Sequence, residues 1–152
     1  DHFKFASESS PNTLEQYDNA FDVKKIDMSS CYPISETYFE YNEEDGLFYR
    51  YQYGDPHVDA AFDNTQLAFK NVLVQFAYYE VRDDNGYLAF QVHDDTKDGY
   101  YFTNGKGIHV TWEKTADYEP TRFYDDNGNE IELNTGKTMI CIVEDGDEFG
   151  YD

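Results

Sequence analysis

The segment RYQYGDPHVD, residues 50–59, holds the side chains whose types and spacing could do acid–base chemistry. His57 and Asp59 are two positions apart in a stretch stiffened by Pro56, so an extended chain would project both from one face. A histidine beside a carboxylate can act as a general base. One hypothesis is therefore a hydrolase with a His57/Asp59 centre, completed by a further carboxylate or a metal-bound water.

A nucleophile for such an enzyme is hard to find in this sequence. All six serines lie at or before Ser35, no GxSxG elbow is present, and Cys31 lies in no recognisable catalytic motif. The alternative is that Arg50, His57 and Asp59 form a hydrogen-bonded cluster that anchors a loop. We favour this structural interpretation, and we assign no catalytic residue.

Three acidic segments gather oxygen ligands of the kind that calcium prefers: DDNG at 83–86, DDTKDG at 94–99 and DDNGNEIE at 125–132. None is an EF-hand, because Gly105 stands where the segment from Asp94 would need its bidentate glutamate. Asp and Asn before Gly are also good hairpin turns, which is the favoured interpretation. We expect no cofactor and no metal site, with calcium as the alternative that a melting-temperature titration would reveal.

Tyrosines interleave with carboxylates along much of the chain. Such a composition suits stacking on sugar rings or docking of a peptide through amphipathic rings. Tyrosine is equally an ordinary choice for the half-buried face of a curved sheet, and we favour that explanation. The tyrosines concerned are Tyr38, Tyr41, Tyr49, Tyr51, Tyr53, Tyr78, Tyr79, Tyr100 and Tyr101.

Strands must position these residues, because helical periodicity is weak. Apolar residues recur at helical spacing only across NTLEQYDNAF and DNTQLAFKNV, which allows at most one or two short helices. Strand patterns recur at short spacing, each bounded by Asp, Asn and Gly residues that favour tight turns. The predicted fold class is mainly β, an antiparallel barrel or sandwich built from consecutive hairpins.

Particular segments carry this prediction. The hairpin candidates are SETYFEYN with GLFYRYQY, NVLVQFAYYEV with YLAFQVH, and TRFYDD with NEIELN. In the first, Gly46 is expected to take a positive φ in the turn. In GIHVTWEK, Ile108, Val110 and Trp112 alternate with polar residues, so Trp112 is predicted to be core. KTMICIVE has apolar residues on both faces, which predicts a central strand covered on both sides.

Length and charge limit the classes of function. The chain has 152 residues, so we expect a single domain over 1–152. It carries 32 Asp and Glu against 11 Lys and Arg, a net charge of −21 that repels nucleic-acid phosphates. No apolar run approaches the roughly 20 residues of a membrane-spanning helix. A halophile-like acidic surface that serves solubility alone is a further hypothesis.

The two cysteines, Cys31 and Cys141, form no CxxC motif and no cluster with histidine, so no zinc site is predicted. They are either a disulfide or two free thiols. A bridge would stabilise the fold by roughly 4–5 kcal/mol on the chain-entropy model, because it would close a long loop. The sequence leaves both states open.

The order of several motifs resembles the C-terminal domain of the YerB-like family of bacterial lipoproteins. The likeness runs from about Ile26 to Glu144, through YRYQYGDPHVD, KNVLVQF, GKGIHVTWEK, PTRFYDDNGNEIELN and GKTMICIV. The likeness is carried by the NVxVQ strand, the TWxK step and the TxFxDxxGxxIxLNxGKTxIxIV ending. These are structural motifs, so they identify the family better than they indicate an activity. Met139 departs from the aromatic residue expected after GKT.

The resemblance implies an extracytoplasmic protein tethered to the bacterial membrane by a lipid on an upstream cysteine, with an α/β domain preceding the present chain. No established reaction comes with it; in this setting the alternative hypothesis is a cell-wall or glycan hydrolase that uses the His57/Asp59 centre. The residues that it marks as ligand-binding candidates are Arg50, His57, Asp59, Asn71 and Gln75. Our leading hypothesis is a non-catalytic cell-envelope module that binds a cell-wall glycan or another envelope protein. A neutral or cationic partner is easier to accommodate than an anionic wall polymer.

Overall fold

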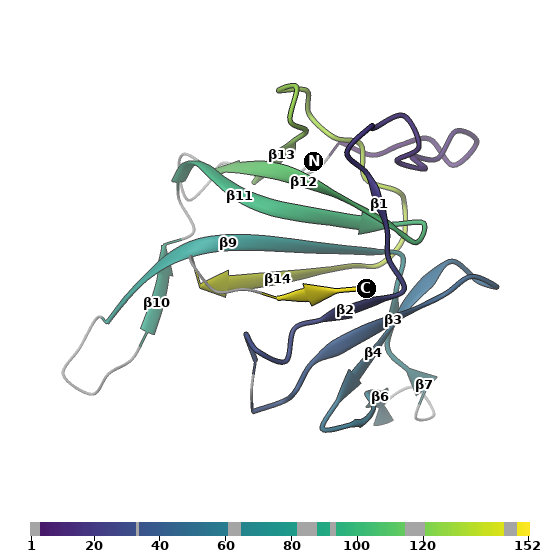
Figure 1. The fold of residues 1–152 in the computed structure, drawn as a ribbon, viewed down its shortest axis with the longest axis vertical. Helices are drawn as coiled ribbons and strands as arrows, with labels where there is room; N and C mark the ends of the chain where they lie inside the picture. The colour runs from purple at the N-terminus through teal and green to yellow at the C-terminus, as the bar shows by residue number, and fades with distance from the viewer. Residues whose placement is uncertain are drawn as a thin grey trace.

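A computed structural model describes residues 4–32, 34–60, 65–81, 88–91, 94–114, 121–144 and 149–152. Strands dominate these segments, and no α-helix occurs among the residues described (Figure 1). The prediction of a mainly β fold is therefore confirmed. Two principal sheets pack as a sandwich rather than closing into a barrel.

The larger sheet has seven strands, in the order β1-β12-β11-β9-β10, with β13 added to β12 and β14 added to β9. Its strands are β1 (Phe21–Asp22), β9 (Asn71–Val81), β10 (Leu88–Gln91), β11 (Asp94–Thr103), β12 (Lys106–Lys114), β13 (Arg122–Tyr124) and β14 (Thr138–Glu144). All pairs are antiparallel except β14 with β9, which is parallel. The long strands β9, β11 and β12 form the centre of this sheet (Figure 1).

The smaller sheet has six strands, in the order β15-β2-β3-β4-β5, and β8 also pairs with β4, on the edge away from β3. Its strands are β2 (Lys25–Asp27), β3 (Tyr38–Asn42), β4 (Leu47–Gln52), β5 (Asp55–Pro56), β8 (Ala68–Phe69) and β15 (Gly150–Tyr151). β6 (Val58–Asp59) and β7 (Thr65–Gln66) make a separate pair. Strands β3 and β4 run obliquely to β9 in Figure 1. The hairpin between them has Gly46 at φ 72°, as predicted.

Two apolar clusters cover the two faces of the larger sheet. One joins both sheets and includes Phe39 and Phe48 from the smaller sheet with Val72 and Phe102 from the larger. The other contains Trp112, which is fully buried and donates its indole N–H to a backbone carbonyl at 2.8 Å. The core position of Trp112 is therefore confirmed. Burial on both faces explains why these strands are so rich in apolar residues.

A buried polar network joins the N-terminal segment to the larger sheet. Asn134 accepts the N–H of Asn12 at 2.7 Å and donates from Nδ2 to Thr103 Oγ1 at 2.9 Å. The Tyr101 hydroxyl donates to Asn71 Oδ1 at 2.7 Å and accepts the N–H of Asn134 at 3.0 Å. Burial raises the pKa of Tyr101 to about 12, so its phenol stays protonated and can donate. Buried polar groups are stable only when satisfied in this way.

Three local predictions require correction. Strand β14 is covered on both faces, but among the described residues it pairs only with β9, so it is an edge strand. The segment DDTKDG lies within β11 rather than in a turn, with a register shift between Asp94 and Lys97. One of the two helical candidates, residues 12–21, forms turns and bends up to residue 20 and then begins β1 at Phe21. The other candidate contains the short strands β7 and β8.

The cysteines are both free thiols. Cys141 is buried in the cluster between the sheets, and Cys31 packs against that cluster. Burial raises the pKa of the Cys141 thiol to about 12, which keeps it protonated and unreactive. The stability of this region therefore comes from packing rather than from a covalent bridge.

Candidate functional site

The outer face of the β3–β4 hairpin gathers tyrosines and carboxylates. Side chains alternate along a strand, so Phe39 and Phe48 point into the core while Glu40 and Tyr49 face outward. Glu40 pairs directly with Tyr49 across the hairpin, and Tyr38 pairs with Tyr51. The alternation of apolar and polar residues in the two strands thus builds an amphipathic outer face.

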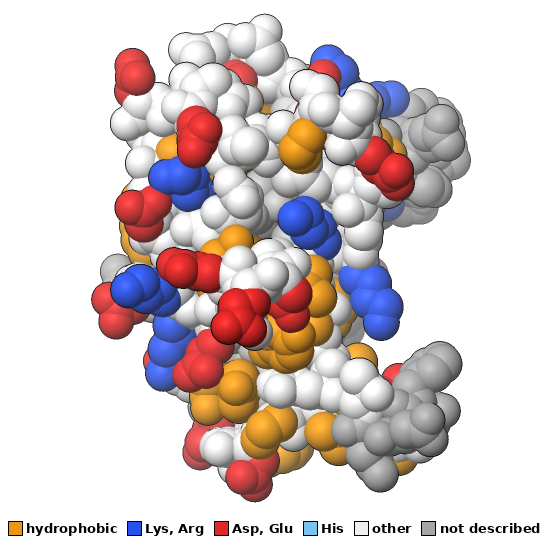
Figure 2. All heavy atoms as spheres, turned by 90° about the vertical axis from the view of Figure 1, so that its right-hand side faces the viewer, with side chains coloured by type: hydrophobic (Ala, Val, Ile, Leu, Met, Phe, Trp, Pro, Cys, Tyr) orange, Lys and Arg blue, Asp and Glu red, His pale blue; other side chains and the backbone are white. Residues whose placement is uncertain are grey.

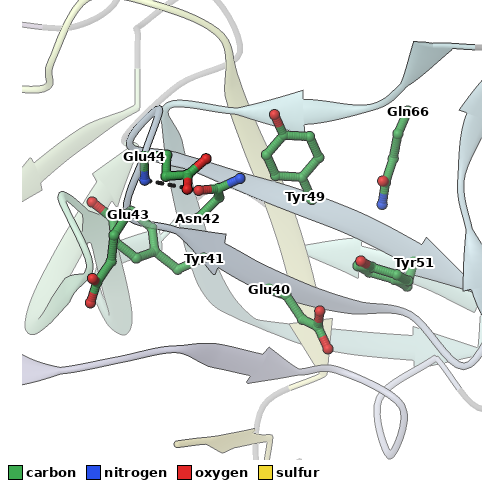
Figure 3. A pocket seen from close by; sticks show the side chains of 8 residues that line it. All are labelled: Glu40, Tyr41, Asn42, Glu43, Glu44, Tyr49, Tyr51 and Gln66. Carbon is green, nitrogen blue, oxygen red and sulfur yellow. Dashed lines mark hydrogen bonds between the residues drawn. The ribbon is translucent and has the colours of Figure 1, made fainter.

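This face is hollowed next to the hairpin turn. The hollow has a volume of about 610 Å³. It is lined by Glu40, Tyr41, Asn42, Glu43, Glu44, Tyr49, Tyr51 and Gln66 (Figure 3). No lysine, arginine or histidine of the described chain belongs to this lining. We call it the acidic hollow, since three glutamates border it and no cation in its lining neutralises them.

Neighbouring contacts fix the rings beside the acidic hollow. Tyr38 and Tyr51 stack with their centroids 4.7 Å apart and their planes only 5° from parallel. The Lys25 ammonium lies over the Tyr38 ring, 4.5 Å from its centroid. Tyr49 donates its hydroxyl to Asp45, and this hydrogen bond raises the pKa of the phenol. A ligand would therefore meet rings that are already oriented, which lowers the entropic cost of binding.

Charged and apolar side chains lie next to each other on the side of the molecule where the β3–β4 turn is. Figure 2 views it from the right-hand side of Figure 1, where the β3–β4 turn lies. Acidic side chains border an area of hydrophobic side chains, and basic side chains lie at its margins (Figure 2). Such a mixture favours a partner that has both an apolar body and charge.

Arg50 and His57, two of the residues predicted from the sequence, lie in contact. The guanidinium Nη1 is 2.9 Å from His57 Nδ1, and Nη2 donates to Thr37 Oγ1 at 3.3 Å. Since arginine can only donate, Nδ1 must accept, and the proton of the neutral imidazole then sits on Nε2. Burial and the arginine charge lower the pKa of His57, which keeps it in this neutral form. The side-chain bond from Arg50 to Nδ1 and the backbone bond from His57 N–H to the Arg50 carbonyl tie the segment around His57 to β4. The arrangement therefore holds a loop in place.

Of the other three candidates, Asp59 acts on His57, because its carboxylate opposes the lowering of the histidine's pKa, whereas Asn71 and Gln75 belong to β9. Asn71 is fully buried in the polar network, and Gln75 is 4% exposed within β9. Asp59 lies half-buried in β6, two residues after His57. The structure therefore brings together Arg50 and His57 and buries Asn71 and Gln75 in the larger sheet. Ligand binding by these five residues stays a prediction.

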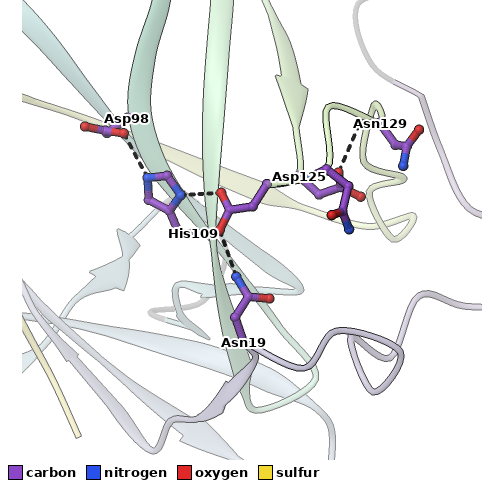
Figure 4. Close-up of polar contacts among 7 residues, drawn as sticks. Asn19, Asp98, His109, Asp125 and Asn129 are labelled. Carbon is purple, nitrogen blue, oxygen red and sulfur yellow. Dashed lines mark hydrogen bonds and ion pairs between the residues drawn. The ribbon is translucent and has the colours of Figure 1, made fainter.

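A second histidine is held between two carboxylates and was missed at the sequence level. His109 Nδ1 lies 2.6 Å from Asp126 Oδ1, and Nε2 lies 2.9 Å from Asp98 Oδ1 (Figure 4). Burial opposes protonation, but the two hydrogen-bonded carboxylates outweigh it and raise the pKa of His109. Asn19 donates to the other oxygen of Asp126 at 3.0 Å. The available signal was the outward position of His109 in GIHVTWEK, although its partners lie elsewhere in the chain.

The acidic segment 125–132 behaves as a turn. Asp125 is 6% exposed, and its Oδ1 accepts the N–H groups of Asn127 at 2.9 Å and Asn129 at 3.0 Å. Gly128 has φ 85°, which glycine adopts without strain. Within the described segments, no group of three or more His, Cys, Asp or Glu side chains is arranged to hold a metal ion. The segment 83–86 lies outside the described residues.

Comparison with known proteins gives a family and a fold. The profile of the family described as "Protein of unknown function (DUF3048) C-terminal domain" matches residues 26–140. The chain is similar to the crystal structure of the YerB protein from Bacillus subtilis, at 19% identity and a TM-score of 0.72. That similarity covers 94% of this chain and 47% of the other, so this chain spans about half the length of the YerB chain. No curated protein matches the sequence.

Proposed function

The chain belongs to the DUF3048 C-terminal domain family, and from that premise we propose that it is a non-catalytic binding module of a bacterial cell-envelope lipoprotein. The module works outside the cytoplasm, tethered by a lipid on the upstream part of the protein. Its partner is a cell-wall glycan or another envelope protein. Within the described part of the chain, no helix is long and apolar enough to span a membrane.

The acidic hollow is the observation that supports this proposal. Its volume of about 610 Å³ lies in the range of ligand sites, roughly 300–1,000 Å³. Tyr49 and Tyr51 offer ring faces, while Glu40 and Gln66 offer polar groups that can orient a ligand. Glycans and peptides both present apolar faces between hydrogen-bonding groups. The hollow is therefore suited to holding such a ligand.

The alternative of a hydrolase centred on His57 and Asp59 fits the geometry less well. A general base needs an unprotonated nitrogen that faces the substrate or the attacking water. The only unprotonated nitrogen of neutral His57 is the Nδ1 that contacts Arg50. Neither His57 nor Asp59 lines the acidic hollow. These observations favour binding over turnover.

The test combines binding and turnover on one ligand set. Purified peptidoglycan fragments are titrated into the protein by calorimetry, and the mixtures are then searched for products by mass spectrometry. We expect saturable binding without products. Tyr49→Ala should weaken binding at least tenfold, whereas Tyr53→Ala should leave it unchanged, because Tyr53 is 62% exposed and lies outside the hollow. Turnover that disappears in His57→Ala would overturn the proposal.

A further inference from the structure

A second hollow adjoins the acidic hollow and carries the opposite charge. It has a volume of about 490 Å³. Its lining consists of Leu47, Tyr49, Thr65, Gln66, Ala68, Lys70, Thr135, Gly136 and Lys137. Two side chains, Tyr49 and Gln66, line both hollows. We call the two hollows together the groove; it is acidic at one end and basic at the other.

Strand pairing sets the distance between the two ends. Glu40 of β3 pairs with Tyr49 of β4, and Tyr49 pairs with Ala68 of β8, so these three form one row across the sheet. Neighbouring strands are about 4.8 Å apart, which places β3 and β8 about 10 Å from each other. Lys70 lies two residues after Ala68, and its N–H donates to the Lys137 carbonyl at 2.9 Å. The Lys70 ammonium reaches back to the β3–β4 turn, where it lies beside Gly46, so Lys137 is the cation of the β8 side.

The middle of the groove can hold a peptide bond against a ring. The hydroxyl of Tyr49 donates to Asp45, which orients the ring between the two ends. The Gln66 amide nitrogen donates to the Arg50 carbonyl at 2.9 Å, which fixes that amide and leaves its oxygen as an acceptor for a ligand N–H. Tyr49 and Gln66 thus supply an apolar surface and a polar contact at the same place.

We propose that the groove binds a short peptide with free ends, with its ammonium beside Glu40 and its carboxylate beside Lys137. This inference rests on the proposed function, since it names the ligand of the same surface. An extended chain advances about 3.3 Å per residue, so a span of about 10 Å corresponds to three or four residues. Opposite charges at the two ends fix the direction of the peptide as well as its length.

The test is a set of four tetra-alanine peptides: free at both ends, N-acetylated, C-amidated and capped at both ends. Their affinities are measured by nuclear magnetic resonance titration of the whole chain. We expect the free peptide to bind most tightly and each cap to weaken binding about fivefold, as for exposed ion pairs. Free dialanine should bind less tightly than free tetra-alanine, because its charges cannot reach both ends.

Variants assign each charge to its end of the groove. In Glu40→Gln, N-acetylation of the peptide should lower the affinity much less than in the unmodified chain, while C-amidation should lower it as before. In Lys137→Gln, C-amidation should lose most of its effect on the affinity, while N-acetylation should keep its effect. Glu15→Gln and Lys24→Gln are matched controls, because both side chains are exposed and lie outside the groove. Resonance shifts should appear at Tyr49 and Gln66.

Several results would overturn the inference. Equal affinity for all four peptides, or no binding of any of them, contradicts it. So do cap effects that persist unchanged in both Glu40→Gln and Lys137→Gln. If glycan fragments still bind and lose affinity in Tyr49→Ala, the proposed function survives while this inference fails. If Tyr49→Ala binds every ligand as tightly as the unmodified chain, both fail.

Discussion

The buried polar network and the groove contain similar residue types but differ in how their polar groups are satisfied. In the network, the Tyr101 hydroxyl both donates and accepts, and Asn134 uses both its oxygen and its nitrogen. In the groove, the glutamates have no cation in the acidic lining, and Tyr49 presents its ring to an open hollow. Polar residues that already have all their partners hold the fold together, while those that face an open hollow are accessible to a ligand.

This difference also separates stability from binding. Removing a partner inside the network leaves buried donors and acceptors unsatisfied, and each such group costs about 1–3 kcal/mol. Water already reaches the side chains of the groove, so removing one of them leaves no buried polar group unsatisfied. The free energy of unfolding should therefore change little. A variant in one region should therefore change the free energy of unfolding, and a variant in the other should change the affinity. The predictions below test this separation.

The largest effect is expected for Asn134→Ala. The change removes the side-chain bonds of Asn134 to the backbone of Asn12 and to Thr103, all of which are buried. We expect the free energy of unfolding to fall by about 2–4 kcal/mol, measured by urea denaturation. Asn129→Ala is the matched control, since Asn129 is exposed, and it should change stability by less than about 0.5 kcal/mol. Equal losses in the two variants would contradict the comparison.

An intermediate effect is expected for His57→Ala. Losing the acceptor Nδ1 leaves Nη1 of Arg50 without its imidazole partner, and Nε of the same guanidinium already has no partner in the described structure. Hydrogen bonds to charged groups contribute about 1.5–3 kcal/mol, and partial exposure reduces this to about 1–2 kcal/mol. The melting temperature should drop by several degrees while peptide affinity stays the same, because His57 lines neither hollow.

A conservative variant sharpens the result for His57. His57→Gln keeps an acceptor oxygen for Arg50, so it should recover part of the lost stability. Scanning calorimetry measures the recovery, and the titration with tetra-alanine serves as the binding control. A His57 variant that keeps its stability but loses affinity would place His57 in the binding surface and contradict the assignment made here.

Much of the fold was predictable because the pattern along each strand is local. The β3–β4 hairpin, the turn at Gly46 and the core position of Trp112 all follow from alternation and turn residues. The parallel pairing of β14 with β9 was not predictable, since apolar residues on both faces indicate burial but not the neighbour. Asp94 and Asp95 resembled a turn because acidic residues are rare in strands, yet pairing with neighbouring strands overrides that preference.

The site was harder to predict than the fold because it depends on partners far apart in the sequence. Asn71 appeared to be a ligand-binding candidate, but Tyr101, Asn134 and Thr138 form hydrogen bonds with it only in the folded chain, where it is fully buried. The tyrosines were identified as possible ring platforms, yet only pairing with β8 brings Tyr49 beside Lys70 and Lys137. Composition indicated the chemistry of the surface, while tertiary structure determined which residues belong to it.

A smaller, pH-dependent effect is expected at His109. Its pKa is raised in the folded state, so the stabilisation is fully present below the unfolded value near 6.5 and is lost as pH rises through the folded pKa. We expect the unfolding free energies of the unmodified chain and His109→Gln to differ by about 0.2–1 kcal/mol near pH 6, where Asp98 and Asp126 are ionised. The difference should shrink by pH 9. A gap that grows with pH would contradict the ion pairs as its source.

The smallest effect is expected from calcium, the one cofactor that the acidic segments suggest. A specific site occupied at a hundred times its dissociation constant would stabilise the fold by about 2.7 kcal/mol, which is roughly 5–10 °C for a chain of this size. We expect no such increase, because Asp125 already uses Oδ1 to cap its own turn. With a net charge of −21, ions still stabilise the chain by screening, so calcium and magnesium at equal ionic strength should raise the melting temperature equally. A saturable increase with calcium alone would instead show that an acidic turn has carboxylate oxygens free to bind the ion, and it would contradict the assignment of these segments as hairpin turns.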